Sequence, residues 1–94
     1  MHVRITRGRS DLARYDEIVA LMREIGEAAK GLPGCSGYTG GVDRTTGEVV
    51  GISRWDSAEA AAFLRDRLGD LVPRLQALGV GLEAPEIYEV IIDL

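Results

Sequence analysis

The chain has 94 residues, of which 46% are hydrophobic and 28% charged, and its formal net charge is -4. This length suits one core, so we expect a single domain over residues 1–94. The acidic balance disfavours nucleic-acid binding, which needs a basic surface. No apolar run approaches the roughly 20 residues of a membrane span, and residues 1–10 lack the apolar core of a secretory signal. We therefore expect a cytoplasmic protein that does not bind membranes.

Cysteine and histidine are nearly absent, since Cys35 and His2 are each the single residue of their type. One cysteine cannot form a disulfide within the chain, and the pair cannot build a thiolate cluster or a multi-histidine metal site. A metal held purely by carboxylates stays open, but no acidic segment has the spacing of an EF-hand loop. We expect no metal and no other cofactor.

The first half of the chain predicts a strand, a helix and a second strand. Residues 2–7 alternate, with Val3 and Ile5 on one face and polar side chains on the other, as in a strand. Apolar residues then follow helical spacing over residues 12–29, and a glycine and a proline just beyond end this helix. The second strand is expected over residues 36–43.

The second half predicts a hairpin, a helix and a last strand. A turn with positive φ at Gly47 leads into a strand over residues 48–55. Asp56 is the expected N-cap of the second helix. Because proline cannot continue a helix without losing a hydrogen bond, Pro73 predicts a break near residue 72 and a short further helical turn. The last strand is expected over residues 86–94.

This order is β-α-β-β-α-β, an α+β ferredoxin-like sandwich with both helices on one face of the sheet. The third and last strands are apolar on both faces, so one face of the sheet would be bare hydrocarbon. A second copy related by a two-fold axis is the simplest cover, and we predict an obligate homodimer whose sheets face each other. Arginines gather near the start of the chain and acidic residues near its end, which predicts cross-strand ion pairs between neighbouring terminal strands.

Four short motifs surround the second and third strands: Pro33-Gly34, Gly37-Tyr38, Trp55-Asp56-Ser57 and Glu59-Ala60. Together with the order of the elements, they resemble the antibiotic-biosynthesis-monooxygenase-like family of dimeric α/β barrels over nearly the whole chain. The resemblance implies a dimeric α/β barrel. It also implies activities that include cofactor-free oxygenation of polycyclic phenols and degradation of haem.

Two departures from the family bear on these implied activities. Haem-degrading members resemble one another in a histidine about ten residues past the tryptophan, where this chain has Leu64 and Arg65. Those enzymes and the phenol oxygenases also use an asparagine near the substrate, and this chain contains no asparagine. Haem degradation by that route is therefore disfavoured, and phenol oxygenation lacks one of its hydrogen-bond donors.

Cofactor-free oxygenation needs a dry cavity, a proton acceptor and donors that stabilise the substrate anion. Following the family, we expect the substrate-binding residues to be Trp55 and Ser53 on the third strand, Tyr38 on the second, and Tyr15, Met22 and Phe63 on the helices. Arg4 and Arg54 would hold an anion if they point into the barrel.

Each of these residues has a packing alternative. A tryptophan at a strand end is usually a core anchor, and the helical members lie at core spacing. The glycines of the second and third strands leave room for a ligand or mark curvature of the sheet.

Two functions remain open from the sequence. The first is a cofactor-independent monooxygenase acting on a small aromatic or polycyclic phenolic molecule. The second is a non-catalytic homodimer that binds a hydrophobic ligand or a protein partner, favoured by the missing asparagine and histidine. RNA binding by the related β-α-β-β-α-β module is set aside, because the first and third strands lack the phenylalanines and tyrosines that stack bases.

Overall fold

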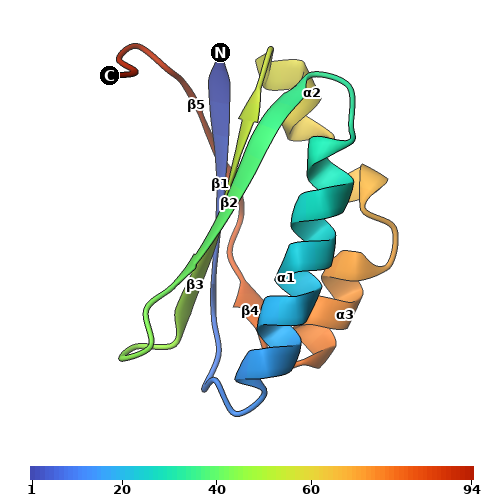
Figure 1. Cartoon of the computed structure of the whole chain (residues 1–94), viewed down its shortest axis with the longest axis vertical. Coiled ribbons are helices and arrows are strands. Elements are labelled where there is room, and N and C mark those ends of the chain that lie inside the picture. Colours follow the sequence, from blue (N-terminus) through green and yellow to red (C-terminus); the bar gives the residue numbers. More distant parts are fainter.

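A computed structural model describes all 94 residues as one sheet with helices on one of its faces (Figure 1). The strands are β1 (His2–Arg9), β2 (Cys35–Val42), β3 (Glu48–Trp55), β4 (Gly81–Leu82) and β5 (Glu86–Glu89). The helices are α1 (Tyr15–Lys30), α2 (Ala58–Ala62), the 3₁₀ turn η1 (Arg65–Arg67) and α3 (Leu71–Ala77). The predicted α+β ferredoxin-like sandwich is confirmed, with β4 as an added short strand. None of its helices has the length and apolar character that a membrane crossing requires.

All strand pairings are antiparallel, and the strand order is β2-β3-β1 with β4 and β5 both beside β1. β4 pairs with the last residues of β1 and β5 with its first residues. The C-terminal segment therefore forms one edge of the sheet and β2 forms the other.

The pairing registers decide which side chains face the helices. In β3, Trp55 and Ser53 are each 1% exposed and point toward the helices, and Arg4 of β1 pairs with Ser53 on that same face. Val3 and Ile5 therefore lie on the opposite face, together with Ile52. The polar side of β1 points inward and its apolar side outward, the reverse of an ordinary half-buried strand.

The core fills the space between the helices and the inner face of the sheet. Its α1 members are Ile18, Leu21, Ile25 and Ala29, which lie on one stripe within the predicted helical range. The buried apolar residues of the whole core are Ile18, Leu21, Ile25, Ala29, Val49, Trp55, Ala61, Leu64, Leu68, Val72, Leu75 and Val80.

The first helix begins three residues later than predicted, at Tyr15. The Leu12 backbone N–H donates to Ser10 Oγ (2.9 Å), and Leu12 has a positive φ of 62°. The Ala13 N–H donates to Asp11 Oδ1 (2.9 Å). These local side-chain bonds stabilise a turn in competition with the helix, so residues 10–14 form a connection to it.

The hairpin and the third strand follow the prediction. Gly47 has a φ of 81°, and β3 occupies residues 48–55. A Cβ at position 47 would lie 1.9 Å from the Ser10 carbonyl oxygen, so the close approach of two backbones requires glycine there.

The second helical region breaks earlier than predicted. Ser57, not Asp56, caps α2, because its Oγ accepts from the Ala60 N–H (3.1 Å). The helix ends at Ala62, and η1 connects it to α3. Pro73 lies in the first turn of α3, where its missing N–H removes no intrahelical bond. The expected break near residue 72 is therefore wrong, since this proline falls near a helix start.

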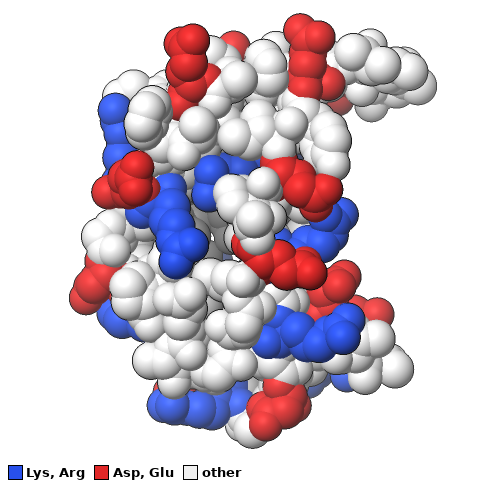
Figure 2. All heavy atoms as spheres, turned by 180° about the vertical axis from the view of Figure 1, so that it is seen from behind, with Lys and Arg blue, Asp and Glu red and all other residues white.

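The last strand is shorter than the predicted range of 86–94 and ends at Glu89. The Val90 N–H still donates to the Met1 carbonyl oxygen (2.9 Å). Residues 91–94 pass beyond the end of β1, so no strand of the sheet lies beside them. Ile91 and Ile92 are 84% and 71% exposed. Seen from behind, this end projects from the molecule as a largely uncharged arm (Figure 2).

Candidate functional site

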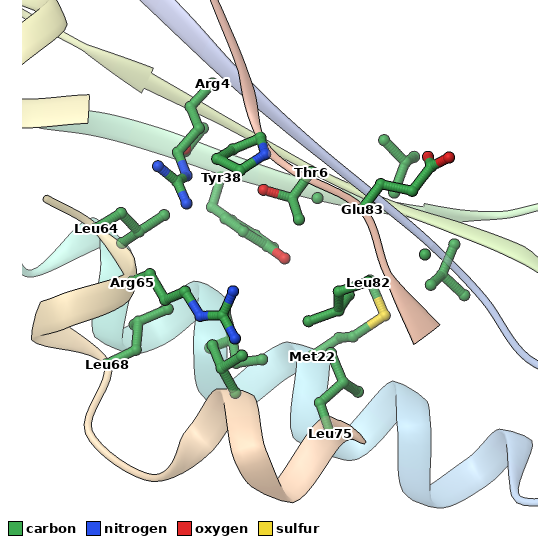
Figure 3. Close-up of a pocket in the computed structure, with 18 residues that line it drawn as sticks. Arg4, Thr6, Met22, Tyr38, Leu64, Arg65, Leu68, Leu75, Leu82 and Glu83 are labelled. Atoms are coloured by element: carbon green, nitrogen blue, oxygen red, sulfur yellow. The ribbon is translucent and has the colours of Figure 1, made fainter. Parts of the chain in front are cut away.

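A cavity of about 70 Å³ lies between the inner face of the sheet and the helices (Figure 3). The helices contribute mainly apolar side chains, and the strands contribute most of the polar ones. The polar and charged residues of the lining are Arg4, Thr6, Tyr38, Ser53, Arg65 and Glu83. This volume holds a few water molecules and is below the roughly 300–1,000 Å³ of ordinary ligand pockets. An aromatic ligand therefore requires side chains of the wall to move.

Tyr38 extends from the edge strand β2 into this cavity across two glycines. A Cβ on Gly51 would lie 2.5 Å from the Tyr38 hydroxyl oxygen, and a Cβ on Gly26 would lie 2.8 Å from its ring. Both glycines therefore make room for the Tyr38 side chain. For Gly51 this differs from the two roles that the sequence left open, room for a ligand or curvature of the sheet. The hydroxyl has no hydrogen-bond partner in the chain and points into the cavity (Figure 3). Burial raises the pKa of Tyr38, so the hydroxyl is a proton donor at neutral pH.

Gly51→Ala is expected to lower the free energy of unfolding by about 1–3 kcal/mol, because the added methyl group displaces the Tyr38 hydroxyl. The loss should be smaller in a Tyr38→Phe background, where the closest clash is absent. Urea unfolding of the four proteins measures this coupling. Gly40→Ala is the matched control, since its Cβ would meet the flexible end of Met22 at 3.3 Å and would stay at ordinary contact distance from the Tyr38 ring (3.8 Å) and the Val50 carbonyl oxygen (3.9 Å). Equal losses in both backgrounds would contradict the assignment of Gly51.

Trp55 and Ser53 form one buried unit on β3. The Trp55 indole N–H donates to Ser53 Oγ (2.7 Å), and each residue is 1% exposed. Ser53 lines the cavity, whereas Trp55 lies in the core outside the lining. Trp55 is therefore a core anchor behind the cavity wall, and the Ser53 hydroxyl satisfies its N–H.

The structure brings together only part of the predicted substrate-binding set. Met22, Tyr38 and Ser53 line the cavity, and the other members do not. Tyr15 is at the first residue of α1, where the Arg44 guanidinium lies 4.3 Å from its ring centre. Phe63 is 56% exposed, because α2 ends one residue before it and the buried stripe passes to Ala61 and Leu64.

The two arginines considered as anion ligands lie on opposite faces of the sheet. Arg4 points inward, is 5% exposed, and donates from Nη1 to the Ala61 carbonyl oxygen (3.0 Å). Arg54 points outward, and its Nη2 would lie 2.8 Å from a Cβ on Gly37. Only Arg4 can therefore reach the cavity.

Arg65 is a cavity residue that the sequence did not place in the site. It extends from η1 into the cavity on the side opposite Arg4 (Figure 3). The available signal was the spacing already noted from Trp55, because Leu64 and Arg65 stand about ten residues past it and both line the cavity. Burial, reinforced by the charge of Arg65, lowers the pKa of Arg4, while Asp66 acts in the opposite direction.

No family model and no curated protein sequence matches the chain, but solved structures do. A candidate antibiotic biosynthesis monooxygenase from Deinococcus radiodurans superposes with a TM-score of 0.80 at 18% identity, covering 100% of this chain and 96% of that one. SnoaB, a cofactor-independent oxygenase from Streptomyces nogalater, gives 0.75 at 16% identity, covering 99% and 96%. The chain has the antibiotic biosynthesis monooxygenase fold. Rv0793 from Mycobacterium tuberculosis shares this fold too, with a TM-score of 0.72, 17% identity and coverage of 99% and 98%.

Within the monooxygenase fold, this chain presents hydrogen-bond donors of its own. Tyr38 offers a free hydroxyl, Arg4 and Arg65 offer positive charge, and Ser53 offers a hydroxyl already engaged with the tryptophan. Most of the remaining lining is apolar. A cavity of this composition can exclude water from an aromatic ring while stabilising negative charge on one of its substituents.

Proposed function

We propose that the protein is a cofactor-independent monooxygenase that oxidises a small aromatic or polycyclic phenolic molecule in this cavity. The observation that carries the proposal is the hydroxyl of the half-buried Tyr38, which points into a space between apolar helices and the sheet (Figure 3). The shared fold with SnoaB, named as a cofactor-independent oxygenase, supports it.

The chemistry needs no external reductant. An anthrone-type phenol loses one proton to give an electron-rich anion, which supplies the electrons that form a carbon–oxygen bond with O₂. The resulting peroxide loses water and leaves a carbonyl group, so one oxygen atom enters the product and the other leaves as water. Tyr38 donates to the anion, and the nearby guanidinium groups favour its ionised form.

A route for the substrate follows from the lining of a second hollow. An open groove between α1 and β2 shares Met22 and Tyr38 with the cavity, so these two side chains form the wall between them. Met22 is unbranched and flexible. Its displacement would join the two spaces and make room for a further ring.

Oxygen uptake with an anthrone-type phenol tests the proposal. We expect uptake above the buffer control, and a kcat about 100-fold lower in Tyr38→Phe because one donor to the anion is lost. Tyr88→Phe is the matched control, since this tyrosine lies outside both the cavity and the groove, on the opposite face of the sheet, and loss of its hydroxyl should leave kcat unchanged. No uptake above buffer would contradict catalysis and favour a non-catalytic ligand-binding protein.

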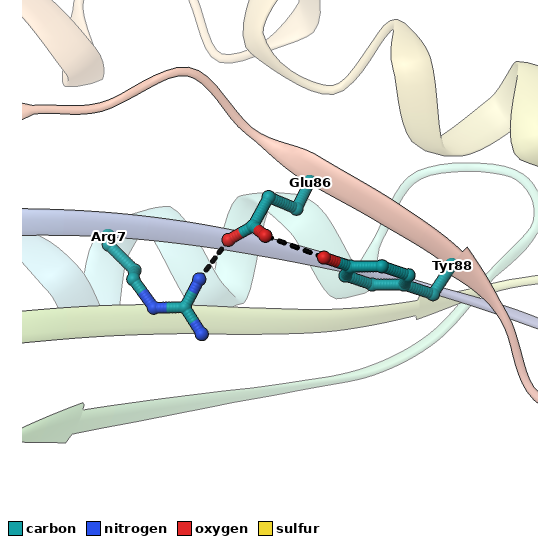
Figure 4. Close-up of polar contacts among 3 residues, drawn as sticks. All are labelled: Arg7, Glu86 and Tyr88. Atoms are coloured by element: carbon teal, nitrogen blue, oxygen red, sulfur yellow. Dashed lines mark hydrogen bonds and ion pairs between the residues drawn. The ribbon is translucent and has the colours of Figure 1, made fainter.

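We also propose that the working form is a homodimer whose sheets face each other, closing the α/β barrel. The support is the outer face of the sheet, where Ile5 and Ile52 lie side by side without a helix over them. Arg7 and Glu86 form the cross-strand ion pair that the charge distribution predicts, and Tyr88 donates to Glu86 Oε2 (2.6 Å) on this face (Figure 4). The projecting arm of residues 91–94 adds further apolar surface that a second copy would cover.

A further inference from the structure

Arg4 carries an unused hydrogen-bonding edge inside the protein. Its Nη1 is engaged with the Ala61 carbonyl, its Nε is buried without a partner, and none of the ion pairs in the chain includes it. The N–H bond of Nε and one N–H bond of Nη2 lie in the guanidinium plane and point the same way, so this edge pairs side-on with two oxygen lone pairs of an anion. A charged donor left unpaired in the interior costs free energy. An anionic ligand would supply the acceptor that the chain itself does not give to Arg4 Nε.

Arg65 adds a second cation to the same space. Its guanidinium enters the cavity from the helical side, whereas Arg4 comes from the sheet, and the ring of Tyr38 lies beside them (Figure 3). The single carboxylate of the lining is Glu83, whose side chain points away from Tyr38 (Figure 3). Like charges at close range raise each other's energy, and an anion placed between them removes that cost.

We infer that the cavity binds its ligand as an aromatic oxyanion, a carboxylate or a phenolate, with the charged oxygen on the Nε–Nη2 edge of Arg4 and Arg65 as the second donor. This inference rests on the proposed function, because it names the ionic form in which the substrate class is held. Binding itself does not depend on turnover, so the two can be tested separately.

Isothermal titration calorimetry with small probes tests the inference on the wild-type protein. Benzoate carries the carboxylate, benzamide is its neutral counterpart of the same shape, and 4-nitrophenol above its ionisation supplies a phenolate. We expect at least one anion to bind about tenfold or more tighter than benzamide, as a charge-assisted hydrogen bond implies. The anion that binds more tightly shows whether the cavity prefers a carboxylate or a phenolate. Equal affinities for benzoate, nitrophenolate and benzamide, or no binding of either anion at millimolar concentration, would overturn the inference.

Arg65→Gln tests the cation with little risk to folding, because this residue is exposed on η1. We expect the affinity for the preferred anion to fall about tenfold and the affinity for benzamide to stay the same. Arg67→Gln is the matched control, since it removes the same charge from the same turn at a position outside the lining. If both substitutions lower the anion affinity equally, the effect comes from long-range charge alone, and the site is refuted.

Arg4→Met removes the guanidinium while keeping an unbranched chain as far as the position of Nε, and should abolish the preference for the anion. Circular dichroism first checks that this variant folds; if it does not, Arg65→Gln decides the question. Anion binding without oxygen uptake would support the anion site and contradict the proposed monooxygenase activity. Oxygen uptake whose KM is unchanged by Arg65→Gln would keep the enzyme and refute the site.

Discussion

Replacing Trp55 by alanine is expected to lower the free energy of unfolding by about 3–5 kcal/mol, as for other large buried aromatic residues. Trp55 is 1% exposed and belongs to the largest fully buried side chains of the chain. Its removal opens a cavity at the end of β3 and also leaves the Ser53 hydroxyl without its donor. Since small domains have total stabilities of about 5–15 kcal/mol, this loss is a large fraction of the whole. Urea unfolding followed by circular dichroism measures it.

Two further variants separate packing from hydrogen bonding at this position. Trp55→Phe keeps most of the ring volume and loses the N–H, so a loss of about 1–2 kcal/mol is expected. Phe63→Ala removes an aromatic ring that is 56% exposed and should cost about 0.5 kcal/mol or less. Similar losses for Trp55→Ala and Phe63→Ala would contradict the assignment of Trp55 as the core anchor. A stable Trp55→Phe protein without turnover would instead give Trp55 a part in catalysis.

Local patterns were sufficient where one physical effect dominates a segment. The residues of β3 alternate between the two faces and start after a glycine turn that no other residue fits, so its bounds at 48 and 55 agree with the prediction. The apolar stripe of α1 also predicts its helix from local spacing, because a helix packed on a sheet needs one continuous apolar face. Both elements could therefore be placed from sequence.

The candidate site could be predicted only in part, because its key contacts join distant segments. Alternation in β1 separates Arg4 from Val3 and Ile5, but it cannot say which set points inward. The usual expectation would bury the two apolar residues, and the structure buries the arginine. Arg65 enters the cavity only because α2 ends early and η1 turns the chain back. Residues 58–64 contain no proline or glycine, so the sequence gives no local signal for this early end of the helix. The pairing of these two cations is thus a property of the tertiary fold.

Ile52→Lys is expected to convert the proposed homodimer into a monomer. Ile52 is at the centre of the outer face, paired with Ile5 on β1 and with Thr39 on β2. A two-fold interface between sheets would bury two such lysines without partners, and each unpaired buried charge costs about 3–5 kcal/mol, so the dissociation constant should rise more than about a hundredfold.

Size-exclusion chromatography with light scattering at micromolar concentration measures the change. Wild-type protein should elute at twice the chain mass and the Ile52→Lys variant at the chain mass. Val19→Lys adds the same charge on α1, on the helical side of the sheet, and should remain dimeric. If the wild-type protein is monomeric, the proposed homodimer is wrong. A dimeric Ile52→Lys protein would show that the two copies meet elsewhere, and the apolar outer face together with its projecting C-terminal arm would then need a different partner to cover it.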